Sequence, residues 1–417
     1  MSDIAKNTWS TATIIPRCTT TNKALQERLS AVESALMETY HTRSNQERTE
    51  FEIKAWEVQL LAEGGYNYVW LVSYTTKYSI PDSIETLSSR KVIIREPKEE
   101  ASPCQIGNEV AFLTYVAKHH PSIPVPKVYA YDLKQSGSNS PYIAMEFIDG
   151  QPLDSVWFHL TESEKASIAD EMAQIIVALS ETNLGGIGGL TLEHKLGPTV
   201  EGFKLFKGRD KFHSPAFYDI GPYPSTHVYV VACYDKEICY YTNASAAELD
   251  EDLFESTSKE QFIESLRTCR DKLFSDISSF LPHEPFALVH GEFCGRNMMV
   301  HNGHISAVID WEFAGSYPLS ELLGGVGVEL FELEDDNLLE YRQWSDRIKD
   351  TVVEKVRNKG WDEKKVALLV GQGNREVQLA RREMIPMDED ADEDEDEDED
   401  DRGAEEGEEG EEGDIGI

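Results

Sequence analysis

Three short hydrophobic runs near residue 300 predict the strands around which the chain is organised. The runs are Ala287–Val289, Met298–Val300 and Ile305–Ile309, and an Asn302-Gly303 turn separates the last two. Short hydrophobic runs joined by Asn-Gly are typical of a β-hairpin. Polar side chains stand where these runs end, so the pattern predicts a tight hairpin-like unit that collects polar groups at its strand ends.

The polar residues at these strand ends are His290, Glu292, Asn297 and Asp310. One carboxylate lies five residues before the Asn and a second lies thirteen residues after it, which is the spacing of a phosphoryl-transfer site. In such a site Glu292 orients the acceptor hydroxyl and takes its proton, while Asn297 and Asp310 hold Mg²⁺ against the phosphates of ATP. His290 belongs to this catalytic set, and we expect it to hold the loop through hydrogen bonds rather than to act as a base.

This stretch resembles the catalytic core of the aminoglycoside phosphotransferase family, in particular its fungal-type members, within the protein-kinase-like small-molecule kinases. The family pattern is His-Gly-Asp, an Asn five residues on, and then Ile-Asp-(Trp/Phe)-Glu. The corresponding residues here are His290-Gly291-Glu292, Asn297 and Ile309-Asp310-Trp311-Glu312, so that Glu292 replaces the expected Asp. The resemblance implies a two-lobed α+β protein-kinase-like fold, with a β-rich first lobe and a helical second lobe. It also implies an ATP- and Mg²⁺-dependent phosphotransferase that acts on a hydroxyl of a small molecule.

The nucleotide-binding half of such a fold is matched by two earlier stretches. An alternating pattern around Gly64 and Gly65 predicts a hairpin whose glycines let backbone N–H groups approach the phosphates, with an ordinary hairpin as the alternative. The resemblance places Arg95, at the end of a β-branched run, on the phosphates. Its expected partner is Glu109, near the start of a helix that opens at Gly107. A surface Arg and a helix-stabilising Glu are the alternatives.

The remaining pattern predicts the hinge and the second lobe. The run Tyr142–Ile148 predicts a strand, and the resemblance makes its end the hinge where Glu146, Phe147 and Ile148 line the adenine site; a core strand followed by a turn is the alternative. Thr161 and Glu164 predict a capping box before a long helix. Residues 23 to about 55 predict one or two amphipathic helices, and residues 183 to about 245, rich in Gly, Pro and Tyr, are expected to form the acceptor pocket.

Charge and composition divide the chain further. The formal net charge is −38, and the last thirty residues are almost wholly Asp, Glu and Gly. We expect a disordered arm over 1–22, the first lobe with its preceding helices over 23–148, the second lobe over 149–386 and a disordered acidic tail over 387–417. So acidic a chain is not expected to bind nucleic acid. Docking of a basic protein partner on the tail is a further hypothesis.

Other features of the sequence concern location and activity. No hydrophobic run is long enough to span a bilayer, so we expect no membrane partner. The six cysteines lack CxxC spacing and suit a cytoplasmic protein, although a Ser/Thr-rich start leaves mitochondrial targeting open. The extra methylene of Glu292 moves its carboxylate by roughly 1.5 Å, and misplacement on that scale costs on the order of a hundredfold in rate. A catalytically weak or inactive nucleotide-binding pseudokinase, or an interaction protein of the same fold, is therefore the alternative function.

Overall fold

The computed structural model describes part of the chain, and the statements below concern that part. The described residues are 13–15, 23–43, 50–63, 67–79, 86–98, 103–133, 141–200, 209–245, 248–249, 254, 256–275, 283–324, 328–334, 336–372 and 384–386. Gly64 and Gly65 at the tip of the expected phosphate-covering hairpin lie outside these residues, as does the expected acidic tail. Of the expected N-terminal arm, only Thr13–Ile15 is described, and it forms a strand.

The first lobe is built on a six-stranded antiparallel sheet in the order β1-β2-β3-β4-β6-β5. Its strands are β1 (Thr13–Ile15), β2 (Glu50–Glu63), β3 (Asn67–Ser79), β4 (Thr86–Pro97), β5 (Val128–Asp132) and β6 (Tyr142–Glu146). The predicted hairpin corresponds to β2 and β3, which pair down to Glu63 opposite Tyr68. The helical prediction for residues 23 to 55 was wrong from residue 50 onward, because Glu50 already pairs with Ser79.

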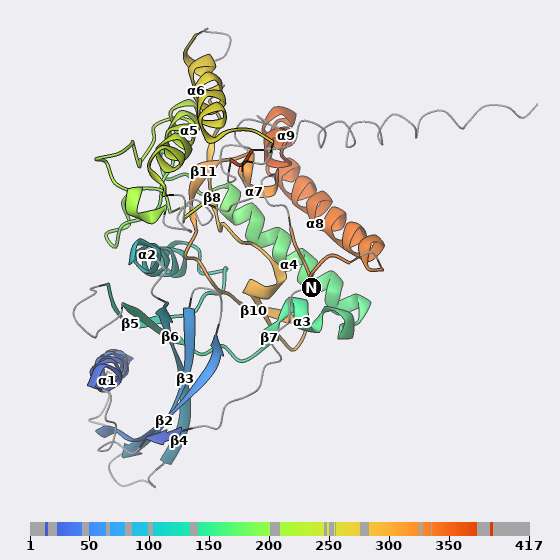
Figure 1. Cartoon of the computed structure of the whole chain (residues 1–417). Coiled ribbons are helices and arrows are strands. Elements are labelled where there is room, and N and C mark those ends of the chain that lie inside the picture. Colours follow the sequence, from blue (N-terminus) through green and yellow to red (C-terminus); the bar gives the residue numbers. More distant parts are fainter. Residues whose placement is uncertain are drawn as a thin grey trace, which may run out of the picture.

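Two helices pack beside this sheet, and the later one in the chain also contacts the second lobe. Helix α1 (Lys23–Arg43) packs Leu29, Val32 and Leu36 against sheet residues that include Val92 and Ile94 of β4. Helix α2 (Pro103–His119) lies between the sheet and the second lobe (Figure 1). Successive side chains of a strand point to opposite faces, so Arg95, next to Ile94, faces α2 rather than α1.

The second lobe is mainly helical, and α4 (Glu162–Ser180) runs through its centre (Figure 1). Thr161 and Glu164 form the predicted capping box at its start, with both reciprocal hydrogen bonds present. The other helices are α3 (Leu153–Val156), α5 (Thr226–Asn243), α6 (Lys259–Ser275), α7 (Glu321–Gly324), α8 (Leu338–Asn358) and α9 (Glu363–Leu369), with short 3₁₀ turns at Trp157–His159, Asp210–Phe212 and Gly295–Asn297. Helix α5 was not predicted from the sequence, where residues 183 to about 245 were expected only to form the acceptor pocket.

Two small sheets carry the polar strand ends. Strands β9 (Met298–His301) and β10 (His304–Val308) form the predicted hairpin, and β7 (Gln151–Pro152) adds to β9. The turn residues Asn302 and Gly303 have φ of 51° and 77°, as a two-residue hairpin turn requires. Strand β8 (Phe286–Val289) does not join this unit as the hairpin-like pattern suggested. It pairs instead with β11 (Gly315–Pro318).

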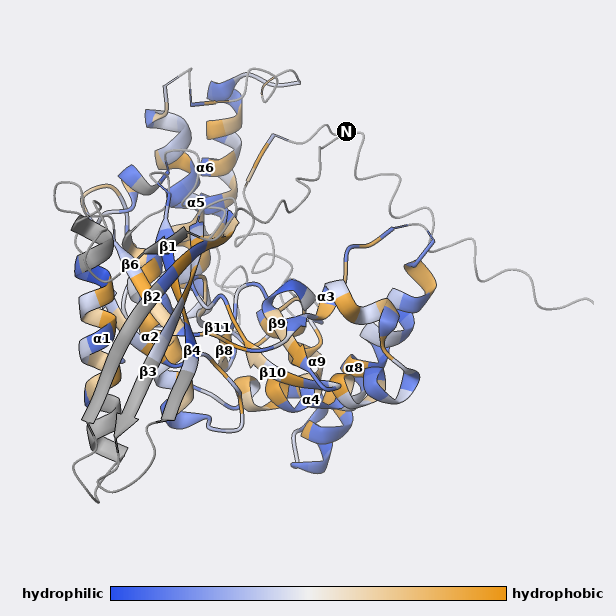
Figure 2. Cartoon of the chain, turned by 90° about the horizontal axis from the view of Figure 1, so that it is seen from below, coloured by the Kyte–Doolittle hydropathy of each residue, from blue (hydrophilic) through white to orange (hydrophobic). Residues whose placement is uncertain are grey.

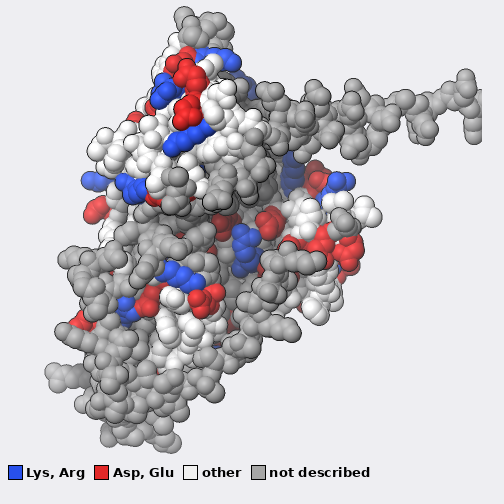
Figure 3. Space-filling view, in the orientation of Figure 1, with Lys and Arg blue, Asp and Glu red and all other residues white. Residues whose placement is uncertain are grey.

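One large buried cluster joins α2 to the second lobe. Ile106, Val110 and Leu113 of α2 belong to the same hydrophobic core as Ile168 and Met172 of α4. In Figure 2, hydrophobic and hydrophilic residues alternate along α2 and α4, as expected of helices that bury one face. On the surface shown in Figure 3, described basic and acidic side chains are intermixed. Among the described residues, no helix is both long enough and apolar enough to cross a membrane.

Candidate functional site

The loop between β8 and β9 is held to the end of β10 through His290. This imidazole is buried, its Nε2 donates to the carbonyl of Ile309 at 3.0 Å, and its Nδ1 accepts from the backbone N–H of Glu292 at 3.3 Å. Burial lowers the pKa of His290 to about 4, so the ring is neutral near pH 7. The geometry therefore agrees with a residue that holds the loop.

Asn297 lies beside the residue that precedes Asp310. Its carbonyl accepts a hydrogen bond of 2.9 Å from the N–H of Ile309, and its side-chain Nδ2 donates to the carbonyl of Glu292 at 3.0 Å. Because the amide nitrogen is used as the donor, the amide oxygen is the atom available to a cation. Ile309 at the strand end is thus bonded to the loop twice: its N–H donates to Asn297 and its carbonyl accepts from His290.

Asp310 occupies an unusual backbone conformation. Its φ is 66°, in the left-handed region that residues other than Gly seldom adopt. Such strained conformations are often found at functional sites, where the surrounding structure holds them in place. Here the side chain, 30 % exposed, accepts a hydrogen bond of 2.6 Å from Arg95. Asp310 is therefore partly accessible and is held by a cation from the first lobe.

Arg95 joins both lobes by contacting three carboxylates. Besides Asp310, it pairs with Glu109 of α2, as the sequence predicted, and lies 3.4 Å from Glu312. Burial alone would lower the pKa of Arg95, but the carboxylates of Glu312 and Asp310 outweigh it and leave the pKa raised. Burial also raises the pKa of Glu312, with Asp310 adding to the effect and Arg95 opposing it. The cluster concentrates negative charge around one guanidinium.

The position of Glu109 on α2 differs from the prediction. Helix α2 begins at Pro103, four residues before the expected start at Gly107, so Glu109 lies in the second turn of the helix. The positive end of the helix dipole is therefore less important there than expected, because its influence fades beyond the first turn. Glu109 is 1 % exposed, and Arg95 is the cation that compensates its charge.

Glu292 faces the same region from the catalytic loop. Its side chain is 29 % exposed and lies 3.5 Å from Arg296. Burial raises the pKa of Glu292, and the nearby charge of Asp310 adds to this effect, while Arg296 opposes it. A carboxylate with a raised pKa is a better proton acceptor than an ordinary one. Arg296 itself is shared between Glu292 and Glu329, at 3.1 Å from the latter.

The expected hinge follows β6 in the structure. Glu146 is exposed, and its carboxylate accepts from the N–H of Lys127 at 3.3 Å, while Phe147 lies beneath the ammonium group of Lys91 at 4.5 Å. The backbone N–H and C=O of Ile148 have no hydrogen-bond partner within the described part of the chain. Ile148 therefore offers the backbone groups that a nucleobase at a hinge needs, whereas the Glu146 side chain is occupied by Lys127.

Asn108 is a residue of this region to which the sequence analysis gave no role. It neighbours Glu109 on α2, is 3 % exposed, and donates to the carbonyls of Glu312 and Ala314 at 2.9 and 2.8 Å. The available signal was an Asn within a hydrophobic helical pattern. Asn is a poor helix former, so such a position is often explained by a specific side-chain contact.

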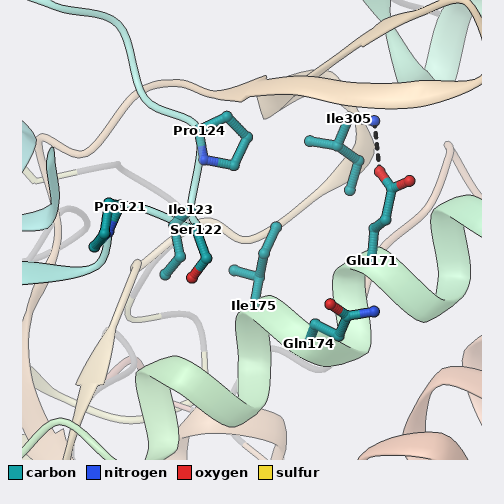
Figure 4. Close-up of a pocket in the computed structure, with 8 residues that line it drawn as sticks. All are labelled: Pro121, Ser122, Ile123, Pro124, Glu171, Gln174, Ile175 and Ile305. Atoms are coloured by element: carbon teal, nitrogen blue, oxygen red, sulfur yellow. Dashed lines mark hydrogen bonds between the residues drawn. The ribbon is translucent and has the colours of Figure 1, made fainter.

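A pocket of about 340 Å³ lies apart from these residues (Figure 4). It is formed by the segment Pro121–Pro124, by α4 and by Ile305, and none of its eight lining residues is a predicted site residue. Glu171 reaches from α4 across one side of it and accepts from the N–H of Ile305 at 2.7 Å. The pocket therefore lies where the segment Pro121–Pro124 packs against α4 and β10, and it is distinct from the candidate site.

The profile of the phosphotransferase enzyme family, APH, matches residues 57–343, which is more than half of the chain. The chain belongs to this phosphotransferase family. The resemblance found in the catalytic stretch is thereby confirmed, and so is the two-lobed, protein-kinase-like fold with its antiparallel first lobe. The family match spans all the residues of the candidate site, from Arg95 to Glu312.

The individual relatives of this chain are distant. A subtelomeric hrmA-associated cluster protein of Aspergillus fumigatus is 29 % identical over 161 residues, or 36 % of this chain and 28 % of that protein. The chain thus matches less than a third of the length of this relative. Among solved structures, a thermostable mutant of aminoglycoside phosphotransferase APH(4)-Ia is 17 % identical to this chain, with a TM-score of 0.42. The match covers 84 % of this chain and 88 % of the chain of that mutant. A GDP and kanamycin complex of APH(2")-IIIa is 14 % identical, covers 81 % and 87 %, and has a TM-score of 0.37.

Proposed function

We propose that this phosphotransferase moves the γ-phosphoryl group of ATP to a hydroxyl of a small molecule and uses Mg²⁺. One observation carries the proposal. Asn297 of the catalytic loop is hydrogen-bonded to the residue before Asp310, and Asp310 in turn contacts the buried Arg95–Glu109 pair. This arrangement unites a loop, a strand end and a cation from the other lobe, which are the parts that phosphoryl transfer requires.

The donor atoms present suit Mg²⁺. The amide oxygen of Asn297 and the carboxylate of Asp310 are hard oxygen ligands, and Mg²⁺ in nucleotide sites takes one or two protein ligands, with phosphates and water completing its shell. Groups of three or more His, Cys, Asp or Glu side chains that could hold a metal are absent from the described residues. The carboxylates of Glu109, Asp310 and Glu312 outnumber Arg95, and a divalent cation would offset that excess.

The residues of the site would divide the work as follows. Arg95 would contact the nucleotide phosphates while Glu109 holds its orientation. Asn297 and Asp310 would hold Mg²⁺, which when bound neutralises the charge that develops on the phosphates. Glu292 would orient the acceptor hydroxyl and accept its proton. His290 would keep the loop in place, and the backbone of Ile148 and the ring of Phe147 would bind the base.

A specific observation supports a second candidate, a nucleotide-binding pseudokinase. Asp310 is already engaged by Arg95, and Glu292 stands where the family pattern has Asp. If Arg95 holds Asp310 permanently, the carboxylate is withheld from the metal. The protein would then bind nucleotide weakly or without turnover.

The two candidates are separated by measuring ATP consumption against a panel of small-molecule alcohols. We expect turnover by the native chain in Mg²⁺ with at least one alcohol, and its loss by at least about a hundredfold in Asp310→Ala. Asp346→Ala, which removes an exposed carboxylate on α8, is the matched control and should keep full activity. Nucleotide binding by the native chain without turnover on any alcohol would favour the pseudokinase instead.

A further inference from the structure

Three backbone groups from two segments of the second lobe are hydrogen-bonded to the side chain of Asn108. Its Nδ2 donates one hydrogen bond to the carbonyl of Glu312 at 2.9 Å and another to that of Ala314 at 2.8 Å. Its Oδ1 accepts from the N–H of Leu190 at 3.0 Å. Both donors and an acceptor site of one buried amide are therefore used, and all three partners belong to the second lobe.

The space around this amide is filled. A methyl group placed on Gly189 would come within 2.6 Å of Asn108 Oδ1 and within 2.7 Å of the carbonyl of Pro198. A Cβ atom essentially never makes contacts this short, so the segment carrying Leu190 approaches the amide as closely as glycine allows. By contrast, a methyl on Gly107, the preceding residue of α2, would meet only Leu133 at 3.4 Å, an ordinary contact.

The position of Asn108 in the chain makes this junction relevant to the site. The next residue of α2 is Glu109, which pairs with Arg95. The carbonyls that Asn108 holds follow Asp310 by two and four residues. Helix α2 also shares the large hydrophobic core of the second lobe, so α2 and the segment after Asp310 are attached by both packing and hydrogen bonds.

We propose that Asn108 is a positioning residue that clamps α2 to the backbone after Asp310, and so fixes Glu109, Arg95 and Asp310 relative to one another. It touches neither nucleotide nor metal in this assignment. The part that concerns metal and nucleotide rests on the proposed function, whereas the clamp itself is a property of the fold. Because of the clamp, α2 and the metal-holding segment would move together as one unit.

The clamp predicts an effect on Mg²⁺-dependent nucleotide affinity. In Asn108→Ala the segment carrying Asp310 loses two hydrogen bonds to α2, so Asp310 is held less precisely. We expect the ratio of the ATP dissociation constant in EDTA to that in Mg²⁺ to fall by about tenfold, as the loss of hydrogen bonds on this scale implies. Isothermal titration calorimetry measures both constants. Gly189→Ala disturbs the same junction from the second lobe and should lower the ratio in the same way.

Matched controls separate positioning from general stability. Gly107→Ala alters α2 next to Asn108, and Asn243→Ala removes an amide that donates to the carbonyl of Cys239 on α5. Neither should change the ratio. If Asn108→Ala and Gly189→Ala lower the melting temperature but leave the ratio at the native value, Asn108 is only structural and the proposal is overturned.

Hydrogen–deuterium exchange tests the clamp without reference to nucleotide. The N–H of Leu190 loses its acceptor in Asn108→Ala, and the peptide 309–316 loses its attachment to α2. We expect both to exchange about tenfold faster, with no change in Gly107→Ala. If the native chain shows no Mg²⁺-dependent ATP binding, the proposed function fails. In that case hydrogen–deuterium exchange still tests whether Asn108 clamps α2 to the second lobe. Unchanged exchange over residues 309–316 in Asn108→Ala would overturn the clamp.

Discussion

The guanidinium of Arg95 is buried among Glu109, Asp310 and Glu312. Arg95→Met keeps much of the side-chain volume but leaves Glu109 and Glu312 buried without their cation. We expect it to lower the free energy of unfolding by about 3–5 kcal/mol, the cost of removing one partner from a buried ion pair. Urea denaturation followed by circular dichroism measures the change.

Arg296 supplies the control for this prediction. Its side chain is 51 % exposed and contacts Glu292 and Glu329 at 3.5 and 3.1 Å. Solvent screens such contacts, so Arg296→Met should change the free energy of unfolding by less than about 1 kcal/mol. Equal losses for the two variants would mean that the buried cluster contributes no more than a surface pair.

Glu292 allows a test of the catalytic role at one atom. Glu292→Gln keeps the size of the side chain and removes its ability to accept a proton, so we expect turnover to fall by roughly 10²–10⁴-fold. The ATP dissociation constant should stay within about twofold, because Glu292 is not assigned to the nucleotide. Steady-state kinetics and calorimetry give the two numbers. Equal turnover by Glu292→Gln and the native chain would remove Glu292 from the reaction.

Residue by residue, the sequence was informative where spacing is local. The positions of His290, Asn297 and Asp310 follow from short hydrophobic runs and turns, and in the structure His290 and Asn297 are both hydrogen-bonded to the backbone of Ile309, the residue before Asp310. The triple contact of Arg95 was only partly predictable, because Glu109 and Glu312 lie far apart along the chain. The role of Asn108 depends on three segments meeting in space, which no local pattern reports.

At the scale of elements, α1 lies before the family match at residue 57 but is part of the first lobe's core. Leu29 of α1 is 6 % exposed and packs on the sheet. We expect Leu29→Ala to lower the free energy of unfolding by about 2–5 kcal/mol, as for other buried Leu residues. Thermal and urea denaturation test this, with Ser30→Ala on the exposed side of α1 as the control. A negligible loss in Leu29→Ala would mean that α1 is only loosely attached.

Helix α5 shows why one element was missed in the sequence. Nearly every residue from Thr226 to Tyr241 is buried or half-buried, so the helix has no solvent-exposed face along most of its length. A helix without an exposed face need not repeat polar residues every 3.6 positions, and that repeat is the signal by which surface helices are recognised in a sequence. The hairpin of β9 and β10 and the capping box of α4 were predictable, because a turn and a cap are specified by adjacent residues.

At the scale of the whole molecule, the two lobes share the candidate site, so ligand binding should stabilise the entire fold. ATP at a hundred times its dissociation constant would add about 2.7 kcal/mol to the free energy of unfolding. We expect a corresponding rise in melting temperature with Mg²⁺, and its reduction when EDTA removes the metal. Differential scanning fluorimetry measures both. An identical rise with and without the metal would speak against a metal held between Asn297 and Asp310.

The central claim is that Asn297 and Asp310 hold one divalent cation on the phosphates of a nucleotide. The most direct measurement is a crystal structure of the native chain with Mg²⁺ and a non-hydrolysable ATP analogue. We predict a cation bound by the amide oxygen of Asn297 and the carboxylate of Asp310, with Arg95 on the phosphates and the base beside Ile148. A nucleotide bound elsewhere, or a cation that contacts neither residue, would contradict the account.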